Sequence, residues 1–154
     1  MKQNEIFFTS NTSETEALGQ ALANQMLCDP TLPPFIALYG DLGVGKTAFV
    51  RGFASVIAPD SAVRSPTFAL VNEYRAKPRS LFHFDMYRID SEDDLYSIGF
   101  YDYLDRAGIC LVEWSEKIPY ALPDEFLRIT IEKNDPSDPN RRKITVETAV
   151  NENL

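Results

Sequence analysis

The stretch GDLGVGKT at residues 40–47 constrains this chain most, and the apolar run Phe35–Tyr39 leads directly into it. It fits the pattern G-x-x-x-x-G-K-[ST], in which glycines let the backbone wrap and point successive N–H groups at phosphate oxygens. The apolar run is typical of a strand buried on both faces, as in a parallel sheet. From Phe49 to Ile57 apolar residues recur at helical spacing. Strand, glycine-rich turn and helix are the local context of a phosphate loop.

Two side chains of this stretch have direct roles in phosphate chemistry. Lys46 can reach the β- and γ-phosphates of a nucleotide, and the Thr47 hydroxyl can take one position around Mg²⁺. The following helix adds the partial positive charge of its N-terminus. Binding alone does not cleave a phosphate, because hydrolysis also needs further Mg²⁺ ligands and a group that orients water.

Two acids are placed where such groups are needed. Asp85 follows the apolar segment 81–84, and Glu113 follows the apolar segment 109–112. Open parallel sheets bind ligands at the C-terminal ends of their strands. Either carboxylate could therefore hold Mg²⁺ directly or through water, although each could instead be a helix cap or part of a surface ion pair.

Three further features bear on the site. Ser65-Pro66-Thr67 comes about as far beyond Thr47 as the threonine that senses the γ-phosphate in switch proteins, but an ordinary Ser-Pro turn is an alternative. His83, the only histidine, is expected to be a packed or hydrogen-bonded core residue rather than a base. Trp114, beside Glu113, either packs near the site or fills the core.

Apolar strands alternate with helices, which predicts an α/β protein with a mainly parallel sheet. A capping pattern at 11–14 predicts a helix, and Ser91 begins a short one. A hairpin is expected around the polar turn 75–80. We expect a single domain over 1–154, with a frayed tail at 149–154. The expected strands are 5–9, 35–39, 68–74, 81–84, 109–112, 126–131 and 144–148.

Composition argues against several classes of function. The net charge is −8 and the longest basic cluster, Arg141–Lys143, is short, which disfavours autonomous nucleic-acid binding. No apolar run is long enough for a membrane helix, and the polar N-terminus does not resemble a signal peptide, so a cytoplasmic protein is expected. Cys28 and Cys110 are far apart, which favours two reduced thiols.

Two other functions are compatible with a phosphate loop. A small-molecule kinase would also need an acceptor pocket and usually an arginine-rich lid, and no such run occurs. A nucleotide-binding switch that does not hydrolyse would need only the loop, although the guanine-specific motif N-K-x-D is absent from the sequence.

Four motifs taken together resemble the TsaE (formerly YjeE) family over about residues 5–148: GDLGVGKT, SPTFALVNEY, HFDMYR and CLVEWSEK. The resemblance implies a three-layer sandwich like that of P-loop NTPases, with a mainly parallel central sheet and added antiparallel strands. It implies an ATPase that uses ATP and Mg²⁺, is weak alone, and supports the turnover of the TsaB–TsaD complex in biosynthesis of tRNA N6-threonylcarbamoyladenosine. The partners, rather than this acidic chain, would carry the tRNA.

The resemblance also implies roles for particular residues. Thr47 and Glu113 would bind Mg²⁺, and Asp85 would order Mg²⁺ or water. Thr67 would act from the switch segment, and Lys46 would take part in catalysis. Thr12 and Arg142 would flank the nucleotide, although Arg141 could replace Arg142. The phosphates would be bound by Gly43, Val44, Gly45, Lys46, Thr47 and Ala48.

Overall fold

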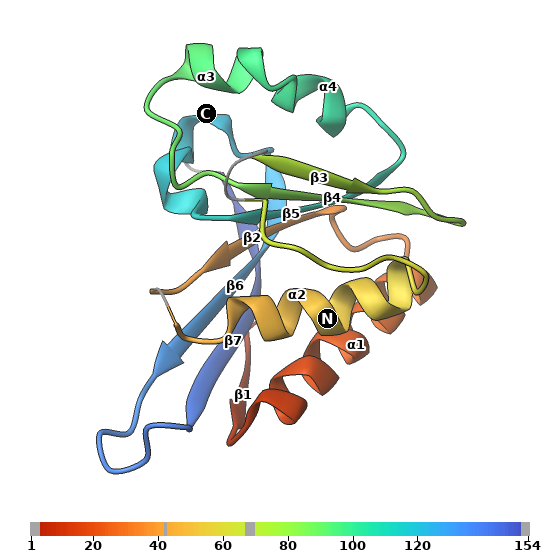
Figure 1. Ribbon diagram of the computed structural model, residues 1–154. Helices are drawn as coiled ribbons and strands as arrows, with labels where there is room; N and C mark the ends of the chain where they lie inside the picture. Colours follow the sequence, from red (N-terminus) through yellow and green to blue (C-terminus); the bar gives the residue numbers. More distant parts are fainter. Residues whose placement is uncertain (1–3, 42, 67–69, 152–154) are drawn as a thin grey trace.

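The computed structural model describes residues 4–41, 43–66 and 70–151, in which one sheet lies between helices (Figure 1). Its strand order is β1-β7-β6-β2-β5-β4-β3. The strands are β1 (Glu5–Thr9), β2 (Phe35–Tyr39), β3 (Val71–Tyr74), β4 (Ser80–Asp85), β5 (Gly108–Glu113), β6 (Glu125–Lys133) and β7 (Arg142–Val150). The helices are α1 (Thr12–Cys28), α2 (Lys46–Ile57), α3 (Glu92–Ser97) and α4 (Phe100–Leu104), with 3₁₀ turns η1 (Ser115–Lys117) and η2 (Pro119–Ala121).

The sheet is mixed. A parallel centre with added antiparallel strands is what the resemblance implies, whereas the alternation of strands and helices alone predicted a mainly parallel sheet. Its centre, β6-β2-β5-β4, is parallel, but β1 with β7, β7 with β6, and β3 with β4 pair antiparallel. For β3 with β4 and for β7 with β6, the physical reason is the length of the connections. Short loops at 75–79 and 134–141 reverse the chain within a few residues, whereas parallel pairing needs a long crossover. The predicted hairpin of β3 and β4 is confirmed.

Both faces of the central strands are buried, which explains the unbroken apolar run of β2. Ile36 and Leu38 belong to the core beneath α1 and α2, whereas Phe35 and Ala37 belong to the core beneath α3 and α4. Phe35 packs edge-to-face against Phe100 of α4, with ring centroids 6.4 Å apart. Because alternate side chains of a strand point to opposite faces, one apolar segment supplies both cores.

The start of α1 is held by the predicted capping pattern. The Glu14 N–H donates to Asn11 Oδ1 at 2.9 Å, and the Ser10 N–H donates to Glu14 Oε1 at 2.8 Å. Further along, α1 meets α2 at a very close crossing. A Cβ added to Gly52 would lie 2.0 Å from the Glu16 carbonyl oxygen, so only glycine fits there. The two helices are therefore fixed against each other, and Thr12 of α1 and Ala48 of α2 line a common pocket.

The C-terminal segment is more ordered than expected. Strand β7 continues to Val150, which pairs with Glu125, and Asn151 is buried. Its side-chain amide donates to the Leu122 carbonyl at 2.6 Å. The expectation of a frayed tail from 149 is therefore wrong for 149–151, because ladder and side-chain hydrogen bonds hold these residues; 152–154 lie outside the described residues.

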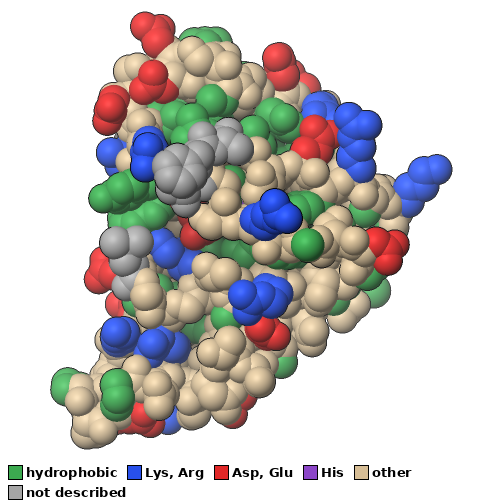
Figure 2. All heavy atoms as spheres, in the orientation of Figure 1, with side chains coloured by type: hydrophobic (Ala, Val, Ile, Leu, Met, Phe, Trp, Pro, Cys, Tyr) green, Lys and Arg blue, Asp and Glu red, His purple; other side chains and the backbone are tan. Residues whose placement is uncertain are grey.

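The exposed acidic residues agree with the net negative charge of the sequence. Acidic side chains gather at the top of Figure 2, over α3 and α4, where Asp90, Glu92 and Asp93 are exposed.

Both cysteines are free; Cys28 is exposed, whereas burial raises the pKa of the Cys110 thiol to about 12. Among the helices of the described ranges, none has the length and apolar character of a membrane span.

Candidate functional site

The glycine-rich loop connects the end of β2 to the start of α2 and depends on left-handed backbone conformations. Gly43 and Gly45 have φ values of 77° and 110°, which side chains other than glycine rarely tolerate. Gly45 is the N-cap of α2, and no side chain caps this end. The first backbone bond of the helix runs from the Phe49 N–H to the Gly45 carbonyl. The N–H groups before Phe49 therefore remain open to an anion.

Lys46 is buried and forms no ion pair among the described residues. Its side chain is only 6% exposed with the rest of the residue, and its Nζ makes no hydrogen bond there. Its Nζ lies over the Trp114 ring, 4.1 Å from the ring centroid. Burying an unpaired ammonium costs free energy, which an incoming anion would recover. The site is thus built to receive negative charge.

Asp85 and Glu113 lie directly opposite each other at the ends of β4 and β5. Both are buried. The Tyr87 N–H donates to Asp85 Oδ1 at 2.9 Å, and His83 Nε2 donates to Glu113 Oε2 at 2.6 Å. Their expected meeting at one edge of the sheet is observed, because β4 and β5 are parallel and in register at these positions.

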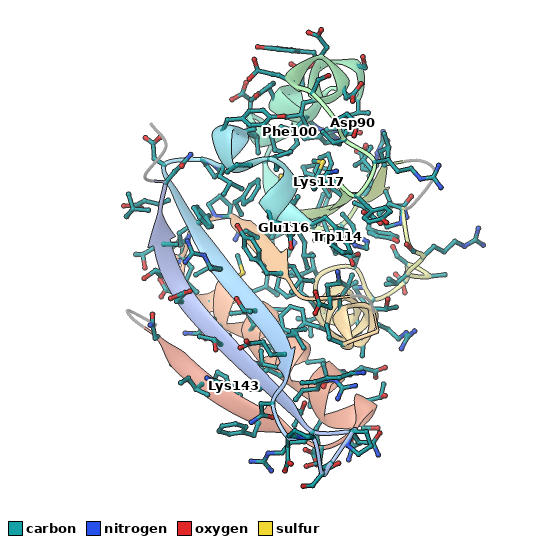
Figure 3. All side chains as sticks on the ribbon, turned by 90° about the vertical axis from the view of Figure 1, so that its left-hand side faces the viewer. Asp90, Phe100, Trp114, Glu116, Lys117 and Lys143 are labelled. Carbon is teal, nitrogen blue, oxygen red and sulfur yellow. The ribbon has the colours of Figure 1, made fainter. Side chains whose placement is uncertain are left out.

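These residues enclose a cleft of about 360 Å³ beside the start of α2. Figure 3 looks onto this edge of the sheet and shows Trp114 between α2 and the layer of α3 and α4. Thr47 is exposed and lines the cleft. Thr67 lies outside the described residues, but its neighbour Ser65 lines the cleft. The lining residues are Gly43, Gly45, Lys46, Thr47, Ser65, Asp85, Glu113 and Trp114.

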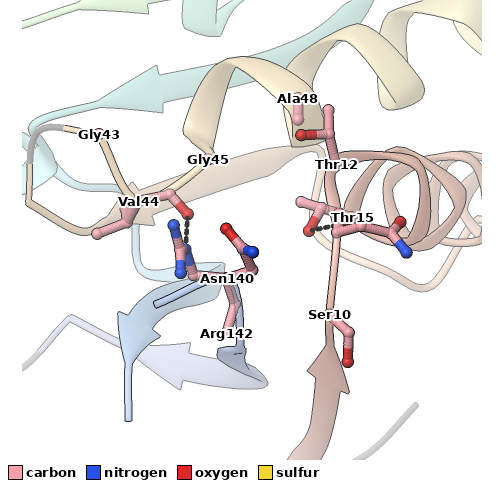
Figure 4. A pocket seen from close by; sticks show the side chains of 10 residues that line it. Ser10, Thr12, Thr15, Gly43, Val44, Gly45, Ala48, Asn140 and Arg142 are labelled. Atoms are coloured by element: carbon pink, nitrogen blue, oxygen red, sulfur yellow. Dashed lines mark hydrogen bonds between the residues drawn. The ribbon is translucent and has the colours of Figure 1, made fainter. Parts of the chain in front are cut away.

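A second pocket, of about 350 Å³, lies on the other side of the loop (Figure 4). It shares Gly43 and Gly45 with the cleft, so the two spaces adjoin at the loop. Thr12, Val44, Ala48 and Arg142, all expected around a nucleotide, lie in its wall. Sequence reasoning did not assign four other lining residues to the site: Ser10, Asn11, Thr15 and Asn140. They come from the segment that begins α1 and from the loop before β7, neither of which carries a binding motif, so only the fold could reveal them.

The structure distinguishes between the two adjacent arginines. Arg142 Nε donates to the Val44 carbonyl at 2.7 Å and so ties β7 to the glycine-rich loop. The guanidinium of Arg141 instead lies over the Phe8 ring, 4.6 Å from its centroid. Arg142 is the first residue of β7, whereas Arg141 belongs to the preceding loop, and only Arg142 lines the pocket.

His83 and Trp114 both contact residues that line the cleft. His83 is buried and hydrogen-bonded, as expected, but its partner is the site residue Glu113. Trp114 has a left-handed backbone with φ of 59° and packs against Tyr87 at 4.9 Å between ring centroids. Left-handed backbone is uncommon for a bulky residue and holds the indole over Lys46.

The fold and the site define a class of α/β protein: a glycine-rich loop joins a parallel strand to a helix, beside a buried lysine and two strand-end acids. Residues 9–144 match the family model described as "Threonylcarbamoyl adenosine biosynthesis protein TsaE". The chain belongs to the TsaE family.

Individual relatives agree with this assignment. The tRNA threonylcarbamoyladenosine biosynthesis protein TsaE of Bacillus subtilis is 38% identical over 125 residues, covering 81% of this chain and 75% of that protein. The protein of the same name from Haemophilus influenzae is 36% identical over 119 residues, covering 77% and 74%. The crystal structure of Bacillus subtilis YdiB matches with a TM-score of 0.74 and 32% identity, over 97% of this chain and 88% of that one.

Proposed function

We propose that this protein is a Mg²⁺-dependent ATPase with a P-loop NTPase-like fold, which acts with TsaB and TsaD in threonylcarbamoyladenosine modification of tRNA. The observation that carries the ATPase proposal is the buried, unpaired ammonium of Lys46, which lines the same cleft as Asp85 and Glu113. The ammonium can bind a phosphate group, and the two carboxylates in the same cleft can bind Mg²⁺ or orient a water molecule. The biological role is supported by family membership.

The donor set of the cleft fits Mg²⁺. Thr47 would supply a hydroxyl and Glu113 a carboxylate, and Mg²⁺ prefers such oxygen ligands together with substrate phosphates. No described residue donates to Glu113 Oε1, so this oxygen is available. When bound, Mg²⁺ would neutralise charge on the phosphate oxygens and hold them in place.

The chain's own residues would divide the remaining work. Backbone N–H groups of the loop and of the first turn of α2 bind phosphate oxygens, and Lys46 balances the charge that spreads over the γ-phosphate. Asp85, whose Oδ1 is held by the Tyr87 N–H, orients water or Mg²⁺. Thr67 would complete the switch segment. In this proposal the triphosphate occupies the cleft, and the nucleoside lies in the adjoining pocket between Thr12 and Arg142.

Turnover with and without partners tests this function. We expect slow ATP hydrolysis by the protein alone and severalfold faster hydrolysis when TsaB–TsaD and tRNA are present, measured as released phosphate. Binding without turnover, even with the partners, would favour a switch that does not hydrolyse. Faster ATP consumption with a nucleoside or nucleotide acceptor would favour a kinase.

In a mobility-shift assay, this chain alone should not bind tRNA tightly, because its net charge is −8.

Arg142→Ala should weaken nucleotide binding about 10- to 100-fold, because hydrogen bonds to charged groups contribute about 1.5–3 kcal/mol. The substitution removes the bond from Arg142 Nε to the Val44 carbonyl and one wall of the nucleoside pocket. Titration with a fluorescent ATP analogue measures the dissociation constant. Arg141→Ala is the matched control and should stay near the wild-type value; equal effects of the two substitutions would contradict the assignment of Arg142.

A further inference from the structure

We infer that His83 is a positioning residue, which holds the Glu113 carboxylate so that one oxygen is presented to Mg²⁺ in the cleft. The inference rests on the proposed function and extends it to a residue outside the lining of the cleft. Its basis is the hydrogen bond from His83 Nε2 to Glu113 Oε2, 2.6 Å long, between two buried side chains.

The sheet register brings these side chains together. In β4, His83 and Asp85 are two residues apart and point to the same face, and Asp85 pairs directly with Glu113 of β5. His83 itself pairs with Leu111, so it reaches Glu113 along the diagonal of the ladder. The imidazole therefore lies deeper in the sheet than the two acids and contacts the glutamate from the side away from the end of the strand.

This contact gives the two carboxylate oxygens of Glu113 different roles. Oε2 accepts from His83, and no residue of the described ranges donates to Oε1. Glu113 also lines the cleft that contains Lys46 and Thr47. A glutamate side chain has several rotatable bonds, so an anchored Oε2 restricts the directions in which Oε1 can point. Outer hydrogen bonds of this kind commonly orient metal-binding carboxylates.

Packing alone does not account for a histidine at this position. Its sequence neighbours in β4 are Phe82 and Phe84, and His83 is 2% exposed. Its other nitrogen, Nδ1, is buried and has no hydrogen-bond partner among the described residues. Leaving a buried nitrogen unpaired is unfavourable, and an apolar side chain would avoid this cost. Among the described residues, the His83 side chain hydrogen-bonds only to Glu113. Holding the Glu113 carboxylate therefore explains why a histidine occupies this buried position.

Substitutions that differ in reach test this role. His83→Gln can place an amide N–H near the position of Nε2, whereas the shorter His83→Asn cannot, and His83→Leu removes the donor. We expect His83→Asn and His83→Leu to weaken Mn²⁺ binding to the complex with a non-hydrolysable ATP analogue by about 10- to 100-fold. His83→Gln should stay close to wild type, and metal-free affinity for the analogue should stay unchanged in all three variants.

The readout is Mn²⁺ affinity by electron paramagnetic resonance, with thermal unfolding measured in parallel. If His83→Leu does not fold, the comparison of His83→Gln with His83→Asn decides. Wild-type Mn²⁺ affinity in both of these variants, or an equal loss in both, overturns the positioning role while leaving the proposed function intact. Absence of Mn²⁺ binding to the wild-type protein with the analogue would instead overturn the proposed function, and this inference with it.

Discussion

Lys46→Ala should lower ATP turnover by a factor of about 10²–10³, both alone and with TsaB–TsaD, because it removes a preorganised cation from the γ-phosphate. The ammonium is buried, has no hydrogen-bond partner among the described residues and lies over the Trp114 ring. Such a group contributes to catalysis by being in place before charge develops in the transition state. Released phosphate, measured at saturating ATP, gives the effect on kcat.

Stability measurements separate this effect from damage to the fold. Removing an unpaired buried charge should not lower the free energy of unfolding, so Lys46→Met, which keeps most of the volume, should unfold at or above the wild-type denaturant midpoint. Lys117→Ala is the matched control, because Lys117 is exposed on η1 close to Trp114 (Figure 3) and does not line the cleft. A Lys46→Ala protein that hydrolyses ATP at the wild-type rate would refute the phosphate site.

Asp85→Asn and Glu113→Gln should each lower turnover by about 10²-fold or more, because each keeps the shape of the side chain but removes the carboxylate charge. The dependence of each loss on Mg²⁺ concentration distinguishes a residue that binds Mg²⁺ from a residue that orients water. The loss in Glu113→Gln should be partly restored at high Mg²⁺ concentration, since a weaker ligand is offset by mass action. The loss in Asp85→Asn should persist if Asp85 orients water, and should be restored if it orders Mg²⁺.

Acids of the same kind outside the cleft serve as controls. Asp90→Asn and Glu116→Gln change exposed residues, both labelled in Figure 3, and should leave turnover unchanged. Steady-state rates over a range of Mg²⁺ concentrations compare all four variants directly. Unchanged turnover in both Asp85→Asn and Glu113→Gln would show that the strand-end acids are not part of the catalytic machinery.

Much of the fold could be predicted from local patterns. The strands at 5–9 and 35–39 have their expected bounds, the helix cap at Asn11 forms the expected bonds, and the glycine-rich loop lies between a strand and a helix. These features depend on hydrogen bonds and backbone preferences within a few residues, which a short stretch of sequence contains in full. The balance of parallel and antiparallel pairs was not predictable in this way, because it depends on which distant strands meet.

The same distinction between local sequence patterns and long-range packing applies to the site. The sequence by itself determined which residue types the proposed chemistry would use: glycines and Lys46 for phosphate, Thr47 for metal, and an acid at the end of each of two apolar strands. Only the tertiary structure decided that Asp85 lies opposite Glu113, that His83 bonds the latter, and that Arg142 rather than Arg141 reaches the loop. These relations follow from strand order and register, which are set by packing between segments far apart in the chain and are not contained in any one of them.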